Sequence, residues 1–192
     1  MEEGSANSPV EGGQVKRVAA NRSIVIVLSL VLALLAGRPI AHAGETYRVH
    51  RVVDGDTITL RAANNSAYIT VRLVGIDAPE KSKAKREPGQ PYSQAAAKHL
   101  ATLVINKNVT MREYGRDRYS RVLAVVLLNG IDINLEMVKT GLAEVYRGTP
   151  APGFDNEPYL KAEREALADG RGMWVQGDKY VSPRQWRKKQ GN

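Results

Sequence analysis

The chain has 192 residues, no cysteine and three histidines, and its 28 lysines and arginines exceed its 20 aspartates and glutamates by eight charges. The absence of cysteine excludes a disulfide framework, a thiolate zinc site and a cysteine nucleophile, and so few histidines make a histidine-rich metal site hard to build. A hydrophobic content of 43% excludes a wholly disordered chain, and the positive charge favours an anionic partner such as nucleic acid, phosphate or a membrane surface.

Residues 1–43 have the pattern of an export signal. Basic residues precede an apolar run at 24–36 that only Ser29 interrupts, and an Ala-x-Ala sequence ends at Ala43. A helix over this run is about 20 Å long, short of the roughly 30 Å hydrocarbon core of a bilayer. We therefore expect a signal peptide cleaved after Ala43, which places residues 44–192 in the periplasm or outside the cell. The alternative is an uncleaved membrane anchor, with the rest of the chain still outside the cytoplasm.

Most of the positive charge lies outside this leader. Residues 44–192 keep 24 of the basic and 17 of the acidic groups, a formal charge of +7. We divide them into one domain at 44–174 and a basic tail at 175–192. Because this domain has no disulfides, it must be stabilised by its hydrophobic core, for which its length suffices.

The first half of the domain is predicted to be mostly β. Strands rich in β-branched residues at 47–53 and 57–61 flank an Asp-Gly hairpin sequence, and residues 68–75 alternate between polar and apolar. A basic loop follows at Lys81–Pro91. Ser93 is the predicted N-cap of a helix that ends near residue 106.

The second half mixes strands and helices. Further strands are predicted at 109–114, 121–128 and 131–133. Asn134 is the predicted N-cap of a short helix over 135–140, and the last predicted helix runs from Asn156 to about Asp169. Trp174 is expected to pack on the core. This succession of short strands with later helices predicts an α+β fold, a small closed barrel with helices packed outside.

Carboxylates gather at two predicted turns. Asp56 lies in the first hairpin turn, and Asp77 and Glu80 follow the third strand. Each group by itself is better explained by turn formation or solvation than by a functional role. Together, Asp56, Asp77 and a backbone carbonyl of Ala78, which precedes a proline, would form an all-oxygen site suited to Ca²⁺ or Mg²⁺.

Two arginines stand near these carboxylates in the predicted strands. Arg72 is in the third strand and Arg121 opens a later one, where an arginine ordinarily pairs with a carboxylate or extends to solvent. A divalent cation, two guanidinium groups and the spare carboxylate of Glu80 are also what phosphodiester hydrolysis can use.

Three motifs in this order resemble the thermonuclease family of staphylococcal-nuclease-like domains. They are Val53-Asp-Gly-Asp-Thr57, Arg72-Leu-Val-Gly-Ile-Asp-Ala-Pro-Glu80 and Asp117-Arg-Tyr-Ser-Arg121. The resemblance covers about residues 47–174 and implies a mainly β, five-stranded OB-fold barrel with three packed helices. It also implies a Ca²⁺-dependent nuclease that cuts DNA and RNA with little base preference and leaves 3′-phosphate ends, with Mn²⁺ or Mg²⁺ as alternative ions.

The resemblance implies a role for each matching residue. Asp56, Asp77 and the carbonyl of Ala78 bind calcium, Glu80 acts on the attacking water, and Arg72 and Arg121 bind the phosphate and stabilise the transition state. Substrate-binding positions are Asp117, Arg118, Tyr119 and Tyr146, although packing is the alternative role for the tyrosines. The loop at 81–91 and Ser120, where glycine is common, depart from the family pattern.

Two other functions remain open from the sequence. An OB barrel can bind nucleic acid by charge and stacking without cutting it. A ribonuclease based on His50 and His99 is a further alternative. In the leading interpretation the partner is DNA or RNA, the chain is a monomer without an obligatory protein partner, and it meets a membrane only if the leader stays attached.

Overall fold

The computed structural model of the chain describes residues 45–62, 67–82 and 88–191. The expected leader at 1–43 and most of the basic residues of the 81–91 loop lie outside these ranges. Within them, no helix is both long and apolar enough to cross a membrane.

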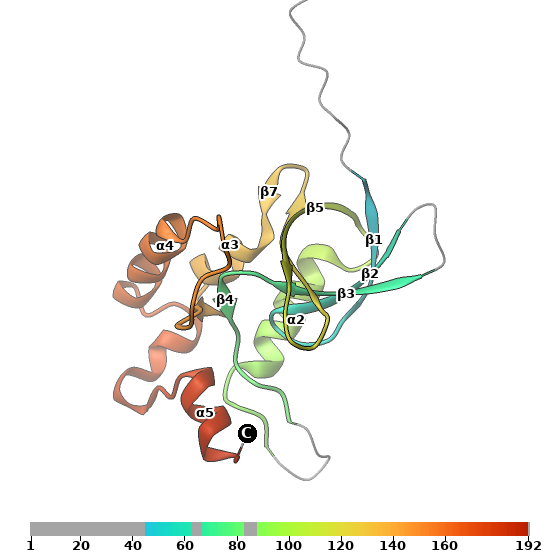
Figure 1. Ribbon diagram of the computed structural model, residues 1–192. Coiled ribbons are helices and arrows are strands. Elements are labelled where there is room, and N and C mark those ends of the chain that lie inside the picture. The colour runs from blue at the N-terminus through green and yellow to red at the C-terminus, as the bar shows by residue number, and fades with distance from the viewer. Residues whose placement is uncertain (1–44, 63–66, 83–87, 192) are drawn as a thin grey trace, which may run out of the picture. The chain divides into compact units, whose positions relative to one another are not determined.

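Five strands close into the barrel that the sequence predicts. The strands are ordered β3-β2-β1-β5-β6, and β6 returns to pair in parallel with β3, whereas the other four pairings are antiparallel (Figure 1). A short strand, β7, extends the sheet beyond β6. The bounds are β1 Tyr47–Val52, β2 Thr57–Ala62, β3 Tyr68–Leu73, β5 Asn108–Arg116, β6 Val122–Leu128 and β7 Ile131–Asp132.

The alternating pattern of β3 explains how it closes the barrel. Val71 and Leu73 are fully buried in the core, whereas Tyr68 and Thr70 face outward. Arg72 points away from the barrel core between those two buried side chains, because successive side chains leave opposite faces of a strand. The pairing of β3 with both β2 and β6 therefore fixes the position of Arg72.

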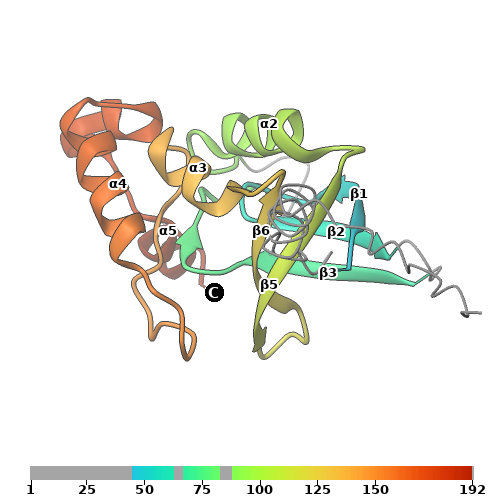
Figure 2. The same cartoon turned by 90° about the horizontal axis from the view of Figure 1, so that it is seen from above.

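Three helices pack on the barrel, as predicted. They are α2 Ser93–Val104, α3 Ile133–Lys139 and α4 Glu157–Ala168, and α3 lies between the other two (Figure 2). The side of α2 that faces the barrel buries Ala96, Leu100 and Val104, which recur at the spacing of an amphipathic helix.

Both helix caps predicted from the sequence are wrong. Ser93 is the first helical residue of α2, and the cap position is Tyr92, which has a left-handed backbone with φ of 69°. The cap of α3 is Asp132, whose carboxylate accepts a hydrogen bond of 2.9 Å from the backbone N–H of Leu135. Asn134 is not free to cap because tertiary contacts use its whole amide.

Asn134 is fully buried and joins α3 to two parts of the barrel. Its Oδ1 accepts a hydrogen bond from the N–H of Val126, and its Nδ2 donates to the carbonyls of Val74 and Ala124, all at 3.0–3.1 Å. Val74 lies in the turn that leads from β3 into the two-residue strand β4, Ile76–Asp77. The amide thus holds the turn that carries Asp77.

The first hairpin turn packs against the segment after β4 at a position that requires glycine. A Cβ on Gly55 would lie 2.6 Å from the Cβ of Ala78 and 2.8 Å from that of Ala96. Only a residue without a side chain allows this close approach. The same segment is fixed from the other side, because β4 pairs with β8, Glu144–Val145, so that Asp77 lies opposite Glu144.

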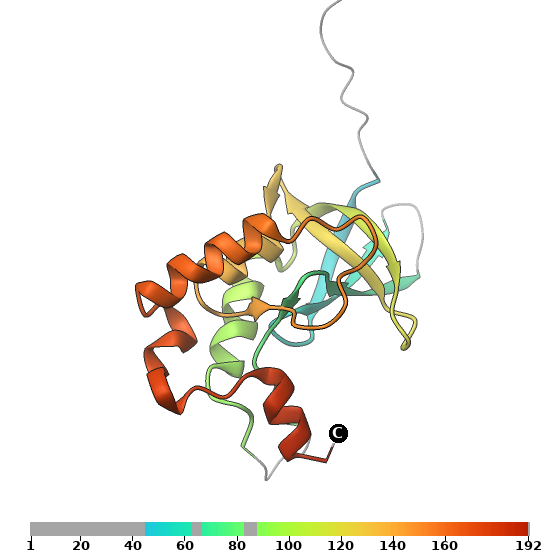
Figure 3. The same cartoon turned by 60° about the vertical axis from the view of Figure 1, so that its left-hand side comes forward.

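The predicted last helix is not the last one. After α4 the chain forms a 3₁₀ segment, η1 Gly172–Lys179, and a final helix, α5 Pro183–Lys189, within the residues predicted to be a basic tail. A capping box starts α5: Ser182 and Gln185 each accept a backbone hydrogen bond from the other, and Pro183 is the first helical residue. Figure 3 shows α5 as the dark red helix in the lower part of the view.

We expect Asn134→Leu to lower the free energy of unfolding by about 3 kcal/mol, because a side chain of similar size leaves the buried N–H of Val126 and the carbonyl of Val74 without this partner, whereas the carbonyl of Ala124 keeps the N–H of Val74. Urea denaturation followed by circular dichroism measures this loss. The matched control is Asn108→Leu, at an exposed position of β5, which should change stability by less than about 0.5 kcal/mol. Equal losses in the two variants would contradict the role given to Asn134.

Candidate active site

Two buried carboxylates and one arginine form the centre of the candidate site. Asp56, in the turn before β2, is 3% exposed, and Asp77, in β4, is 1% exposed. Arg72 of β3 lies between them, with an ion pair from Nη1 to Asp56 Oδ1 and another of 2.9 Å from Nη2 to Asp77 Oδ1. The structure therefore brings together, on one guanidinium group, the two carboxylates that the sequence analysis assigned to a metal ion.

Further hydrogen bonds orient the Asp56 carboxylate. Its Oδ2 accepts a bond of 2.8 Å from the backbone N–H of Ala78, and its Oδ1 accepts one of 3.0 Å from Thr57 Oγ1. Ala78 thus contributes to the site through its N–H. The expected role of the Ala78 carbonyl as an ion ligand stays a prediction.

Burial and ion pairing shift the pKa values of these groups in opposite directions. Burial raises the pKa of Asp56, since leaving water penalises the anion, and the charge of Arg72 offsets part of this effect. Burial alone would lower the pKa of Arg72, but the charges of Asp56 and Asp77 outweigh it, so its pKa lies above the ordinary value. Arg72 is therefore a permanent cation inside the site.

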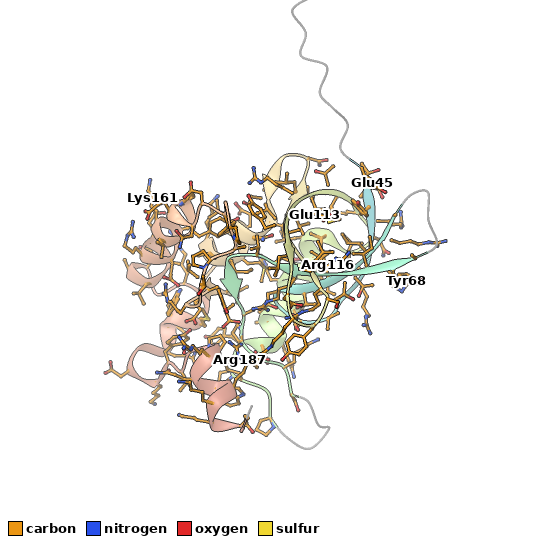
Figure 4. All side chains as sticks on the ribbon, viewed as in Figure 1. Glu45, Tyr68, Glu113, Arg116, Lys161 and Arg187 are labelled. Atoms are coloured by element: carbon orange, nitrogen blue, oxygen red, sulfur yellow. The ribbon has the colours of Figure 1, made fainter. Side chains whose placement is uncertain are left out.

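A second arginine, which no sequence motif had indicated, reaches this cluster from α5. Nη1 of Arg187 lies 2.5 Å from Glu80 Oε1 and 3.1 Å from Asp77 Oδ1, and Nη2 lies 2.8 Å from Asp77 Oδ2. In Figure 4, Arg187 lies between α5 and the segment that follows β4. The hydrogen bond to Asp77 is the main cause that raises the pKa of Arg187. The Ser182–Gln185 capping box was the one sequence pattern that predicts a helix here.

Arg121 is held by the turn between β5 and β6. Its Nε and Nη2 each lie 2.7 Å from Asp117 Oδ2, while Asp117 Oδ1 accepts the backbone N–H groups of Tyr119 and Arg121. Partial burial by itself raises the pKa of Asp117, but the hydrogen bonds from Arg121 prevail and hold it below its usual range. Ser120 adopts a φ of 63° in this turn, which explains why glycine suits the position.

One pocket of about 550 Å³ gathers nearly all the predicted site residues. Of the ten, only Asp77 does not line it; the others do, and they are Asp56, Arg72, Ala78, Glu80, Asp117, Arg118, Tyr119, Arg121 and Tyr146. Tyr119 and Tyr146 are 65% and 43% exposed, so core packing does not explain them. The guanidinium carbons of Arg118 and Arg121 lie 4.8 and 5.5 Å from the centre of the Tyr119 ring.

The chemistry of these side chains suits a hard cation, although arginines now pair with the carboxylates. Asp56, Asp77 and Glu80 supply only oxygen donors, which Ca²⁺ and Mg²⁺ prefer. The three carboxylates face two guanidinium groups, those of Arg72 and Arg187, so negative charge remains in excess. In the part of the chain that the structure describes, no three acidic or histidine side chains are already arranged around a common ion position.

The histidines of the ribonuclease alternative lie elsewhere. His50 contacts Tyr68 with tilted rings whose centres are 4.7 Å apart, and His99 is half-buried on α2. The described residues that line the pocket include no histidine. The geometry therefore gives the histidine mechanism no support.

Glu144 is a buried acid next to the cluster. It lies opposite Asp77 in the β4–β8 pair, and its Oε2 accepts a hydrogen bond of 2.6 Å from the hydroxyl of Tyr180. Burial raises its pKa from 4.5 to about 7. Its Oε1 has no hydrogen-bond partner among the described residues.

Comparisons with known proteins agree with the pocket chemistry. The model of a family described as staphylococcal nuclease homologue matches residues 70–176. An uncharacterized endonuclease of Haemophilus influenzae is 39% identical over 88% of this chain and 88% of its own. One of Escherichia coli is 37% identical over 73% of this chain and 83% of its own. A probable endonuclease LCL3 of Paracoccidioides lutzii is 37% identical over 62% of this chain but only 38% of its own.

We expect Glu144→Gln to remove a pH dependence of stability. Because the folded-state pKa is raised, the stability tied to the protonated acid is fully present below pH 4.5 and is lost as the pH rises through 7. Over this pH range, the raised pKa corresponds to a loss of about 3 kcal/mol in the free energy of unfolding of the wild type relative to the variant. Urea denaturation in chelator between pH 4 and 8 measures the difference. The exposed Glu157→Gln is the control, and a difference that does not vary with pH would contradict the assignment.

Proposed function

The chain belongs to the staphylococcal nuclease homologue family and is a nuclease, and we propose that it is a Ca²⁺-dependent one that hydrolyses DNA and RNA with little sequence preference. The observation that carries the proposal is the convergence of Asp56, Arg72, Glu80 and Arg121 on one pocket. The endonuclease names of the relatives favour catalysis over binding alone.

The two arginines are the proposed phosphate contacts. A guanidinium group offers paired N–H donors that match the oxygens of a phosphodiester, and its attraction grows as negative charge builds up on phosphorus-bound oxygens. Arg121 now shares its donors with Asp117, which holds the side chain at the pocket. Arg72 already lies between the two buried aspartates, so it reaches the phosphate from the barrel side.

Glu80 is the proposed proton acceptor. It lines the pocket, and an ionised carboxylate there orients a water and takes its proton as the water oxygen bonds to phosphorus. The bond from phosphorus to the 5′-oxygen breaks, the leaving oxygen gains a proton from solvent water, and a 3′-phosphate remains. Asp56, Asp77 and the Ala78 carbonyl would hold the cation. When bound, the cation supplies charge neutralisation at the phosphate.

The exposed aromatic side chains support low sequence preference. Tyr119 and Tyr146 line the pocket, and both are exposed to solvent. Stacking on such rings is available to every base, because each base has an aromatic face. The basic loop at 81–91 adds attraction for the phosphate backbone, which should weaken as salt is raised.

The proposal includes export through the leader. Residues 1–43 combine basic residues, a short apolar run and an Ala-x-Ala sequence, which is the order of a signal peptide. The proposed location is the periplasm or the medium, with an uncleaved membrane anchor as the alternative.

We expect Glu80→Gln to lower the rate of cleavage by about 10²–10⁴-fold, and Arg72→Ala by about 10²–10³-fold, because the variants lose the proton acceptor and a phosphate contact. The release of acid-soluble nucleotides from single- and double-stranded DNA and RNA measures the rate, with Ca²⁺ or with chelator. Glu113→Gln and Arg61→Ala, both exposed on strands, are matched controls that should retain activity. Binding without cleavage, or cleavage unaffected by chelator, would overturn the proposal.

The leader gives a separate prediction. Expressed with its native first residues in a Gram-negative host, the protein should be recovered from the periplasm or medium with Gly44 as its N-terminus, because the cleavage site follows Ala43. Mass spectrometry of the intact protein checks this. A full-length chain in the membrane fraction would instead support the anchor.

A further inference from the structure

Asp77, a proposed metal ligand, has both of its oxygens engaged by arginines. Oδ1 accepts from Arg72 and Arg187, and Oδ2 accepts from Arg187 at 2.8 Å. Arg187 also contacts Glu80 Oε1 at 2.5 Å. This explains why Arg187 lines the pocket whereas Asp77 does not. One side chain from α5 therefore covers two of the groups that the proposed reaction requires.

Independent contacts hold α5 in this position. The hydroxyl of Tyr180 donates to Glu144, and Gln90 Nε2 donates to the carbonyl of Val181 at 2.7 Å. The same Gln90 accepts the backbone N–H of Glu80 through its Oε1 at 3.0 Å. Gln90 thus links the segment before α5 directly to the segment that carries Glu80, so the approach of Arg187 is built into the fold.

Arg187 and a metal ion need the same oxygens. A guanidinium group that takes both oxygens of a carboxylate leaves few lone pairs for coordination, and its charge repels an incoming cation. Glu80, while paired with Arg187, is also hindered from accepting a proton from water. α5 lies beyond residue 176, where the match to the family model ends, so Arg187 comes from outside the matched region.

We propose that α5 is an internal inhibitor of the enzyme: Arg187 is a tethered cation that occupies the Asp77 and Glu80 carboxylates and competes with the divalent metal ion. The proposal rests on the proposed function, in that Asp77 is taken as a metal ligand. Metal loading then requires Arg187 to leave, and the apparent metal affinity is reduced by the fraction of molecules in which it is still bound.

Removal of Arg187 should affect the metal-free and metal-bound states in opposite directions. Without metal, Asp56, Asp77 and Glu80 would share the single guanidinium group of Arg72, so the variant should unfold more easily in chelator. With metal, the competitor is gone, so the ion should bind more tightly. Removal of a residue that merely stabilises the fold would lower the stability of both the metal-free and the metal-bound states.

The test measures Ca²⁺ binding by isothermal titration calorimetry, and thermal unfolding with Ca²⁺ or chelator, on the full chain and on Arg187→Ala. We expect Arg187→Ala to bind Ca²⁺ on the order of tenfold more tightly, with a lower melting temperature in chelator and a larger upward shift on adding Ca²⁺. Arg184→Ala is the matched control on the same helix, since Arg184 is exposed and, among the described residues, donates a hydrogen bond only to the carbonyl of Arg147. It should bind Ca²⁺ like the wild type.

Hydrogen exchange of the wild type provides a test without mutation. The backbone amides of α5, at residues 184–189, should exchange faster once Ca²⁺ is bound. Unchanged or weaker Ca²⁺ binding by Arg187→Ala, or greater protection of α5 with Ca²⁺, would overturn the inhibitor while leaving the nuclease proposal intact. A wild type and variant that both fail to bind Ca²⁺, Mn²⁺ or Mg²⁺ would overturn both.

Discussion

The structure depends on the burial of two negative charges at one end of a small barrel. Asp56 and Asp77 are almost completely removed from water, and an uncompensated buried carboxylate is costly enough to be protonated or to disrupt the fold. Arg72 supplies one compensating charge from β3. Glu80 makes the cluster more negative, so a further cation is needed. Arg187 and a divalent metal ion are two solutions to the same electrostatic problem.

The rest of the fold fixes the positions of these charged groups. The parallel pairing of β3 with β6 places Arg72, the amide of Asn134 fixes the turn after β3, and β8 pairs with the strand that carries Asp77. Gly55 lets the Asp56 turn approach Ala78 closely enough for the N–H of Ala78 to bond to the Asp56 carboxylate. Backbone contacts therefore impose the geometry, and the charged side chains need little freedom of their own.

The pocket has a fixed part and a part that must exchange partners. Arg72 is surrounded by buried groups, whereas Arg121 pairs with Asp117 in a turn at the surface. Under the proposed function, a phosphate that enters the pocket would compete with Asp117 for Arg121, and under the proposal for α5 the metal would compete with Arg187. Substrate and metal would thus replace contacts that the protein makes with itself. In the free enzyme, the charged groups of both sites are therefore paired.

Local sequence patterns determined the barrel strands, the three packed helices, the family and nine of the residues that line the pocket, because alternation, turn residues and short motifs act over a few neighbouring positions. They did not decide which partner a versatile side chain takes: Asn134 bridges barrel elements instead of capping α3, and Ser93 lies inside α2. They also did not show that Arg187 meets Asp77, 110 residues earlier. Only the packing of α5 against the barrel decides that contact, because a charge pair depends on distance in space, and spacing along the chain does not encode it.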